Sequence, residues 1–121
     1  MQAVATHKYL RMSPRKVREV ADMIRDLTPS RALEVLPHVR RVAAVPLAKV
    51  IKSAVANAKQ KEINETDLVF TEIQVTQGPI LKRGRPVSRG QWHPVQKKMS
   101  HIRVVLTSSE KEKGAKSGTK N

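Results

Sequence analysis

Between Ile73 and Ser109 the chain carries seven cationic side chains and no Asp or Glu. Ammonium and guanidinium groups bind phosphate oxygens, and they release condensed counterions when they neutralise a nucleic-acid backbone. A stretch with charges of a single sign therefore predicts a polyanionic partner. The seven cations are Lys82, Arg83, Arg85, Arg89, Lys97, Lys98 and Arg103.

The charge of the whole chain supports this interpretation. The net charge is +14 over 121 residues and the pI is about 10.9. Residues 1–72 hold 13 basic and 8 acidic groups, residues 73–109 hold 7 and 0, and residues 110–121 hold 4 and 2. Such a balance indicates a nucleic acid or another anionic surface as the partner and does not bear on the fold.

Catalytic chemistry has little support in the sequence. The four histidines are scattered, no paired carboxylates or Ser-His-Asp set forms a motif, and Gly84–Gly90 lacks the spacing and the Lys of a phosphate loop. The absence of cysteine excludes disulfides and thiolate metal sites. We therefore expect no enzyme activity, no cofactor and no metal.

A membrane partner is also not expected. The longest apolar run, Val42–Ala48, has seven residues and contains Pro46, which is far too short to cross a bilayer. No stretch combines a strong apolar face with a basic one, which argues against a free cationic protein that acts on membranes.

The basic segment from Gly78 to Met99 lies between two strand-like stretches, Leu68–Gln77 and His101–Leu106. The simplest geometry is an antiparallel pair that extends into a protruding hairpin, with a tip on the order of 30 Å from the body. A bare ribbon is marginal in water, and glycines and prolines interrupt this one. We expect bound phosphates to order it; the alternative is a disordered basic loop.

The rest of the chain must supply a body that holds this hairpin. Ala3–Leu10 is predicted as a strand. Ser13 and Pro14 predict a helix start, with the serine hydroxyl as the cap, and an apolar stripe of helical period follows. Its members are Val17, Val20, Ala21, Ile24 and Leu27.

Two further helices are expected. Thr28 and Pro29 predict a short helix over Ser30–Leu36 that Pro37 ends. A third helix begins with Pro46 in its first turn, and its stripe fits the helical period without a miss. The stripe is Leu47, Val50, Ile51, Ala54, Val55 and Ala58.

In the two strands that flank the basic segment, alternation predicts which side chains share a face. One set is Val69, Thr71, Ile73 and Val75, and the other is Ile102, Val104 and Leu106. The composite is an α+β fold, with a three-stranded antiparallel sheet packed with three helices in the order β-α-α-α-β-β and a long protruding basic β-hairpin. We expect one domain over residues 1–107, with the hairpin at 78–99, and a flexible basic tail over 108–121.

Three local sites have two interpretations each. Arg15, Lys16 and Arg18 near a helix start either bind a phosphate or form a solvated face. Trp92 either stacks on a base or guanidinium or packs against Pro86 or Pro94. His101 either donates to a phosphate or is an ordinary strand residue.

Several motifs together resemble the universal large-subunit ribosomal protein twenty-two family in its bacterial form. The hairpin signature comprises Gly78-Pro79, Lys82-Arg83, Arg85-Pro86, Arg89-Gly90, Lys97-Lys98 and Ser100-His101-Ile102. Arg11–Lys16 is similar to the family's entry into the first helix, and Lys49–Ala58 is similar to its third helix. The resemblance covers roughly residues 3–107.

The resemblance implies a structural constituent of the large ribosomal subunit that binds large-subunit ribosomal RNA and supports subunit assembly. Its hairpin would line the nascent-peptide exit tunnel in a cytoplasmic, bacterial-type ribosome. Implied partners are this RNA, neighbouring ribosomal proteins and the nascent polypeptide, without a homo-oligomer.

By the same resemblance, the RNA-binding residues are Arg11, Ser13, Arg15, Lys16, Arg18, Lys82, Arg83, Arg85, Arg89, Lys97, Lys98, Ser100, His101 and Arg103. The tunnel tip comprises Pro86, Val87, Ser88, Arg89, Gly90, Gln91 and Trp92.

The tip departs from the family pattern. The family has arginine at the positions of Val87 and Gln91, alanine at those of Ser88 and Trp92, and an aromatic or aliphatic residue at that of Gly84. We expect Trp92 to change the local constriction.

The main competing interpretation is an architectural DNA-binding protein that enters a groove with a basic β-ribbon. That interpretation requires a dimerisation face, whereas the apolar stripes of this chain are used up by one small core, which favours a monomer.

Overall fold

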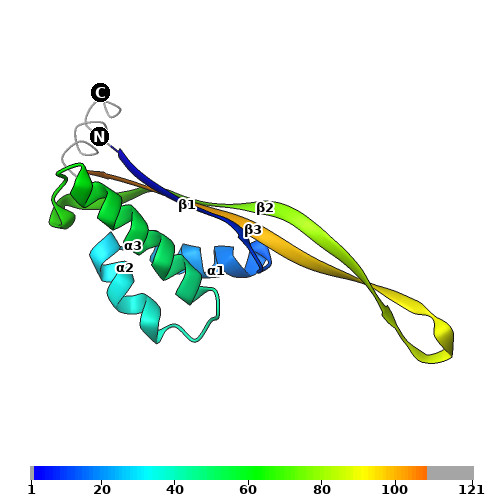
Figure 1. The fold of residues 1–121 in the computed structure, drawn as a ribbon. Coiled ribbons are helices and arrows are strands. Elements are labelled where there is room, and N and C mark those ends of the chain that lie inside the picture. Colours follow the sequence, from blue (N-terminus) through cyan, green and yellow to red (C-terminus); the bar gives the residue numbers. More distant parts are fainter. Residues whose placement is uncertain (1, 109–121) are drawn as a thin grey trace, which may run out of the picture.

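The computed structural model describes residues 2–108, which form a three-stranded antiparallel sheet with three α-helices on one face (Figure 1). This confirms the predicted α+β class and the element order. Short 3-10 turns occupy Leu36–His38, Glu65–Asp67 and Ser88–Gly90. The predicted tail lies outside the described residues except for Ser108, which is part of a strand. The main elements are β1 (Gln2–Leu10), α1 (Pro14–Ile24), α2 (Pro29–Val35), α3 (Ala44–Gln60), β2 (Leu68–Pro86) and β3 (Trp92–Ser108).

The sheet changes from three strands to two along its length. Its order is β1-β3-β2, so β3 pairs with both neighbours in the body. Leu10 and Gln77 both pair with Ser100, the last position at which three strands lie side by side. Beyond it β2 and β3 continue alone, and this two-stranded arm projects far past the helices (Figure 1). We call residues 78–99 the arm and the remaining described residues the body.

Helix α1 begins at Pro14, as the sequence predicts, but Ser13 does not cap it with its side chain. The Ser13 carbonyl accepts from the N–H groups of Lys16 and Val17, and the hydroxyl makes no cap hydrogen bond. The prediction of a hydroxyl cap is therefore wrong. Pro14 already fixes the backbone of the first turn and brings no N–H that would need a partner. The helix ends at Ile24, so Leu27 packs against the core from the turn that follows.

Helix α2 has the predicted length, but it begins and ends one residue earlier than predicted. The Thr28 hydroxyl caps it by accepting from the N–H of Arg31, at 3.3 Å. The α-helix ends at Val35, and Pro37 lies inside the 3-10 turn that follows. A proline without an N–H fits the first turn of such a helix, so Pro37 prolongs the helical path of the chain by one turn instead of ending it at Leu36.

Helix α3 follows the predicted pattern closely. Pro46 lies in its first turn, and all six residues of the predicted stripe are buried. At the other end, the N–H of Ile63 donates to Ala58 and that of Glu62 donates to Lys59. This is a Schellman motif, and it places Glu62 at φ 63°, a left-handed conformation that usually belongs to glycine.

A β-bulge in β2 overturns one predicted face. Phe70 pairs with Leu106 and Glu72 with Val105, so Thr71 is the extra residue. An extra residue shifts every later side chain to the opposite face. Ile73 and Val75 are therefore buried, whereas Thr71 is exposed and Val69 is only partly buried and does not belong to the core. The predicted face of β3, which consists of Ile102, Val104 and Leu106, is fully buried.

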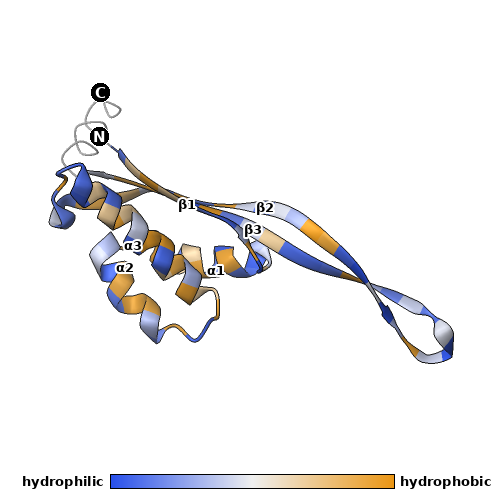
Figure 2. Cartoon of the chain, in the orientation of Figure 1, coloured by the Kyte–Doolittle hydropathy of each residue, from blue (hydrophilic) through white to orange (hydrophobic). Residues whose placement is uncertain are grey.

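The core lies between the sheet and the inner faces of the helices. Figure 2 shows apolar residues on those faces, while the arm is mostly hydrophilic with one short apolar segment on β2. Burying one Leu or Ile side chain contributes about 1.5–3 kcal/mol, so the aliphatic core carries the stability of the body. Its largest members include Ile24, Leu36, Leu47, Ile51, Leu68, Ile102 and Leu106.

Candidate nucleic-acid interface

The arm displays cations on both of its faces. In an antiparallel pair, residues directly opposite each other lie on the same face, and neighbours along a strand alternate. Lys82 lies opposite Gln96 and Lys98 opposite Ile80, which puts both cations on one face. The other face carries three cations, which are Arg83, Arg85 and Lys97.

These cations are exposed and have no carboxylate partner within the described part of the chain. The body differs, because it contains ion pairs such as Glu72–Arg103, at 3.1 Å. The arm therefore concentrates uncompensated charge along an extended and narrow element. A phosphate backbone can approach such an element from either side.

The tip of the arm is a tight reversal. The N–H of Val87 donates to the carbonyl of Gln91 at 2.8 Å, and Arg89 and Gly90 between them have φ values of 64° and 69°. Two successive left-handed residues turn the chain back in register, so that Pro86 pairs with Trp92. The Arg89 side chain is exposed at this turn.

Trp92 lies over Gly84 near the tip. A Cβ atom built on Gly84 would overlap with Cε3 of the Trp92 indole, so only glycine leaves room for the ring in this position. The ring remains 69% exposed. Packing within the tip thus involves Gly84, and a large part of the indole stays open to a partner.

Tyr9, Gly78 and His101 lie in contact at the point where the arm leaves the body. The N–H of Tyr9 donates to Nδ1 of His101 at 3.1 Å, and the two rings pack edge to face at 5.1 Å. Tyr9 has φ 61°, at a register irregularity between β1 and β3. A Cβ on Gly78 would lie 3.1 Å from the His101 ring. Because Nδ1 accepts, neutral His101 carries its proton on Nε2.

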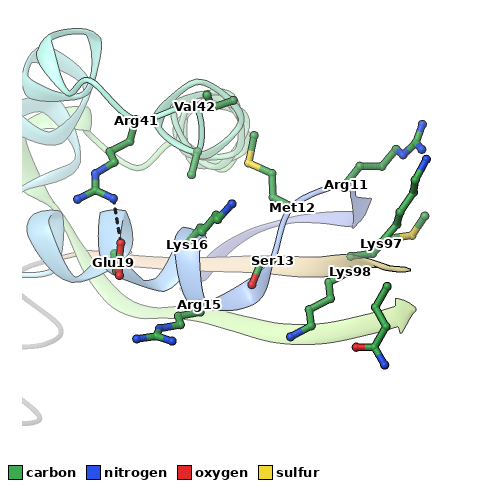
Figure 3. Close-up of a pocket in the computed structure, with 13 residues that line it drawn as sticks. Arg11, Met12, Ser13, Arg15, Lys16, Glu19, Arg41, Val42, Lys97 and Lys98 are labelled. Carbon is green, nitrogen blue, oxygen red and sulfur yellow. Dashed lines mark hydrogen bonds and ion pairs between the residues drawn. The ribbon is translucent and has the colours of Figure 1, made fainter. Parts of the chain in front are cut away.

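The body contributes a groove beside the arm, shown in Figure 3. It has a volume of about 1000 Å³ and lies between the start of α1, the turn before α3 and the base of the arm on β3. It brings together two predicted sets of cations that are some eighty residues apart in the chain. Arg11, Arg15 and Lys16 come from the first set, and Lys97 and Lys98 come from the second.

Among the predicted RNA-binding residues of the body, Arg18 and Arg103 bond to other parts of the body and Ser100 is buried. The Arg18 guanidinium donates to the carbonyl of Val75 through Nε and Nη2, at 3.2 and 3.0 Å. Arg103 pairs with Glu72 on the sheet. Ser100 is fully buried and its hydroxyl has no hydrogen-bond partner, so its side chain is not available to an RNA in this structure.

Sequence reasoning missed several residues of the groove. Arg41, Val42 and Ala43 belong to the turn before α3, and the other missed lining residues are Met12, Glu19, Gln96 and Met99. The pair Arg40–Arg41 just before a predicted helix was the available signal for the first of these. The apolar lining residues had no signal in the sequence, because only the fold brings their three segments together.

Two further classes of site were tested on the structure. Within residues 2–108, no group of three or more His, Asp or Glu side chains could hold a metal ion. No helix in that range has the length and apolarity needed to span a membrane.

Known proteins are similar to the chain over most of its length. The family model described as ribosomal protein L22p/L17e matches residues 5–107. Three bacterial relatives carry the name large ribosomal subunit protein uL22. That of Myxococcus xanthus is 42% identical over 114 residues, which are 92% of this chain and 100% of the relative. That of Desulfitobacterium hafniense strain Y51 is 45% identical over 114 residues, 93% of this chain and 98% of the relative. That of Oceanobacillus iheyensis is 44% identical over 115 residues, 94% of this chain and 100% of the relative.

The matched residues include all three helices and the whole arm. The arm signature, the entry to α1 and the stripe of α3 thus lie inside one continuous match. The chain belongs to the ribosomal protein L22p/L17e family.

Proposed function

We propose that this chain is a structural constituent of the large ribosomal subunit that binds large-subunit ribosomal RNA, with neighbouring ribosomal proteins as further partners. The relatives' name supports the large subunit, and family membership supports a structural protein and not an enzyme. The observation that carries RNA binding is the arm, which presents cations on both faces without a carboxylate within 78–99. Its location would be the cytoplasmic ribosome of a bacterium.

The proposed RNA contacts fall into two regions. Arm residues Lys82, Arg83, Arg85 and Arg89 would bind phosphates deep in the RNA, and the groove cations would bind it at the body. His101 would donate from Nε2, because its Nδ1 already accepts from Tyr9. Residues 1–107 would act as one RNA-binding unit, since β2 and β3 run without a break from the body into the arm.

The tip is proposed to face the nascent polypeptide in the exit tunnel. Support comes from its place at the far end of the arm and from the exposed surface of Trp92. Trp92 would narrow the passage locally. A density map of the assembled subunit tests this: the indole is expected at the lumen, and an indole turned into the RNA would overturn this part of the proposal.

The same arm would support subunit assembly by joining RNA segments that lie far apart. The competing function, an architectural DNA-binding protein, is not favoured, because the whole domain matches a ribosomal family.

Sedimentation tests the main proposal. Cell extract is washed with high salt and separated on a sucrose gradient, and the chain is followed with an antibody. We expect it to stay with the large subunit, because an arm threaded into folded RNA is held by shape as well as by salt-sensitive charge. Its appearance at the top of the gradient or with chromosomal DNA would overturn the proposal.

A further inference from the structure

The groove of Figure 3 combines charge with an apolar surface. Six cations surround it, and its apolar side is formed by Met12, Val42, Ala43 and Met99. A site that served only phosphates would need no such surface. The cations are Arg11, Arg15, Lys16, Arg41, Lys97 and Lys98.

The apolar side chains are held in place by local structure. Val42 is 77% exposed although its neighbours Ala43 and Ala44 are buried. Its turn is fixed by hydrogen bonds from the N–H of Ala44 to Arg41 and from that of Val45 to Val42. Met12 packs partly against the core and extends toward Val42 (Figure 3). The surface is therefore preformed.

The electrostatics of the groove favour an anionic occupant. Among its lining residues the one carboxylate is Glu19, which is paired with Arg41 at 3.1 Å. The remaining five cations have no carboxylate partner among the described residues. An acidic ligand with a flat apolar part would satisfy both the cations and the apolar surface.

An unpaired nucleotide has this chemistry, whereas a duplex does not. In an A-form helix the bases are stacked inside, so a docked duplex would press phosphates and riboses against Val42 and Met12. An extruded base can lie on an apolar surface while its flanking phosphates reach cations.

We propose that the groove binds an unpaired nucleotide of RNA. Its base lies on the surface formed by Met12, Val42 and Met99. The phosphates on its two sides contact Lys16 at the start of α1 and Lys97 at the arm base. This inference rests on the proposed function, because it names the form of RNA that the same protein recognises at its body.

Site-specific cross-linking in assembled large subunits tests the proposal. The variant Val42→p-benzoylphenylalanine carries its photoreactive group at the groove. Val45→p-benzoylphenylalanine is the matched control, because Val45 is 61% exposed on the same stretch of chain and does not line the groove. Both variants are first checked for sedimentation with the large subunit.

We expect position 42 to cross-link to one nucleotide that is unpaired in the folded ribosomal RNA, and position 45 not to reach that nucleotide. A cross-link from position 42 to paired nucleotides or to a neighbouring ribosomal protein would overturn the proposal. So would the absence of any cross-link from position 42 in subunits that contain the variant. Failure of the parent chain to sediment with the subunit would instead count against the proposed function.

Binding in solution gives a second readout with the full chain. Val42→Ser is expected to weaken binding of a single-stranded oligoadenylate by about fivefold, because the base loses its apolar contact with the Val42 side chain. Binding of an RNA duplex of equal length and the salt slope of both ligands should stay unchanged, because no charge is altered. Val45→Ser should change neither single-strand binding nor duplex binding. Equal loss of single-strand and duplex binding by Val42→Ser would contradict a base-specific site.

Discussion

The body and the arm are made from the same two strands but are stabilised by different interactions. In the body, β2 and β3 bury Ile73, Val75, Ile102 and Val104 beneath the helices. In the arm, the same strands expose cations on both faces and bury nothing fully. The body can therefore fold by burying its own apolar surface. The arm is held by the hydrogen bonds between its two strands, and bound phosphates would supply the further stabilisation that it needs.

Matched leucine truncations would give the largest difference between the two regions. Leu47→Ala in α3 removes a fully buried side chain, and we expect it to lower the free energy of unfolding by about 2–5 kcal/mol. Leu81→Ala, at a partly exposed arm position opposite Lys97, should cost about 1 kcal/mol or less. Urea denaturation followed by circular dichroism measures both. Equal losses would mean that the arm belongs to the cooperative unit of the body.

Neutralising charges should affect the arm more than the body, because the quantity measured is RNA binding and not stability. Arg83→Gln with Arg85→Gln should reduce the log–log salt slope of RNA binding by about 1.5, because each phosphate contact contributes about 0.7–0.9. The control pair, Lys49→Gln with Lys52→Gln, removes two exposed charges from α3. Filter binding at several salt concentrations checks this. A control pair that lowered the slope by the same amount would show that the arm has no special part in binding.

The contact between Gly84 and Trp92 gives a prediction confined to the tip. Gly84→Ala should displace the indole, because the new methyl group would overlap with Cε3. Trp92 is the single tryptophan of the chain, so its fluorescence emission reports on the tip alone. We expect a shifted emission and, since the arm lies outside the core, unfolding free energy within about 0.5 kcal/mol of the parent. Unchanged emission would mean that the ring does not rest on Gly84.

A further comparison concerns two left-handed residues, one in each region. Glu62→Gly relieves backbone strain at the end of α3 and should raise the free energy of unfolding by about 1 kcal/mol. Arg89→Gly relieves the same strain at the tip but should leave global unfolding unchanged. Thermal denaturation compares the two. A gain from Arg89→Gly as large as that from Glu62→Gly would contradict the separation of arm and body.

Local sequence signals predicted most of the fold. The period of Leu47, Val50 and Ile51 requires a helix with one buried face, and the α3 of the structure has it. The prolines at 14 and 29 mark helix starts because their missing N–H groups need no partner there. The charge asymmetry of residues 73–109 predicts the arm from the sequence alone.

Features that depend on tertiary register could not be predicted in the same way. The bulge at Thr71 depends on how β2 pairs with β3, and the left-handed Tyr9 depends on its contact with His101. The groove requires residues from three distant segments, so its apolar members Met12, Val42 and Met99 carry no common pattern in the sequence. Cations, by contrast, could be recognised one at a time.

The strand order has a consequence for the timing of synthesis. Because β3 follows both β1 and β2 in the chain yet lies between them, neither earlier strand has a sheet partner while the ribosome is still making β3. The helices can form as they emerge, since their contacts are local. The sheet can form only after β3, the last strand, has been synthesised. For the same reason, a newly made chain completes its two-stranded arm only after β3 has been synthesised.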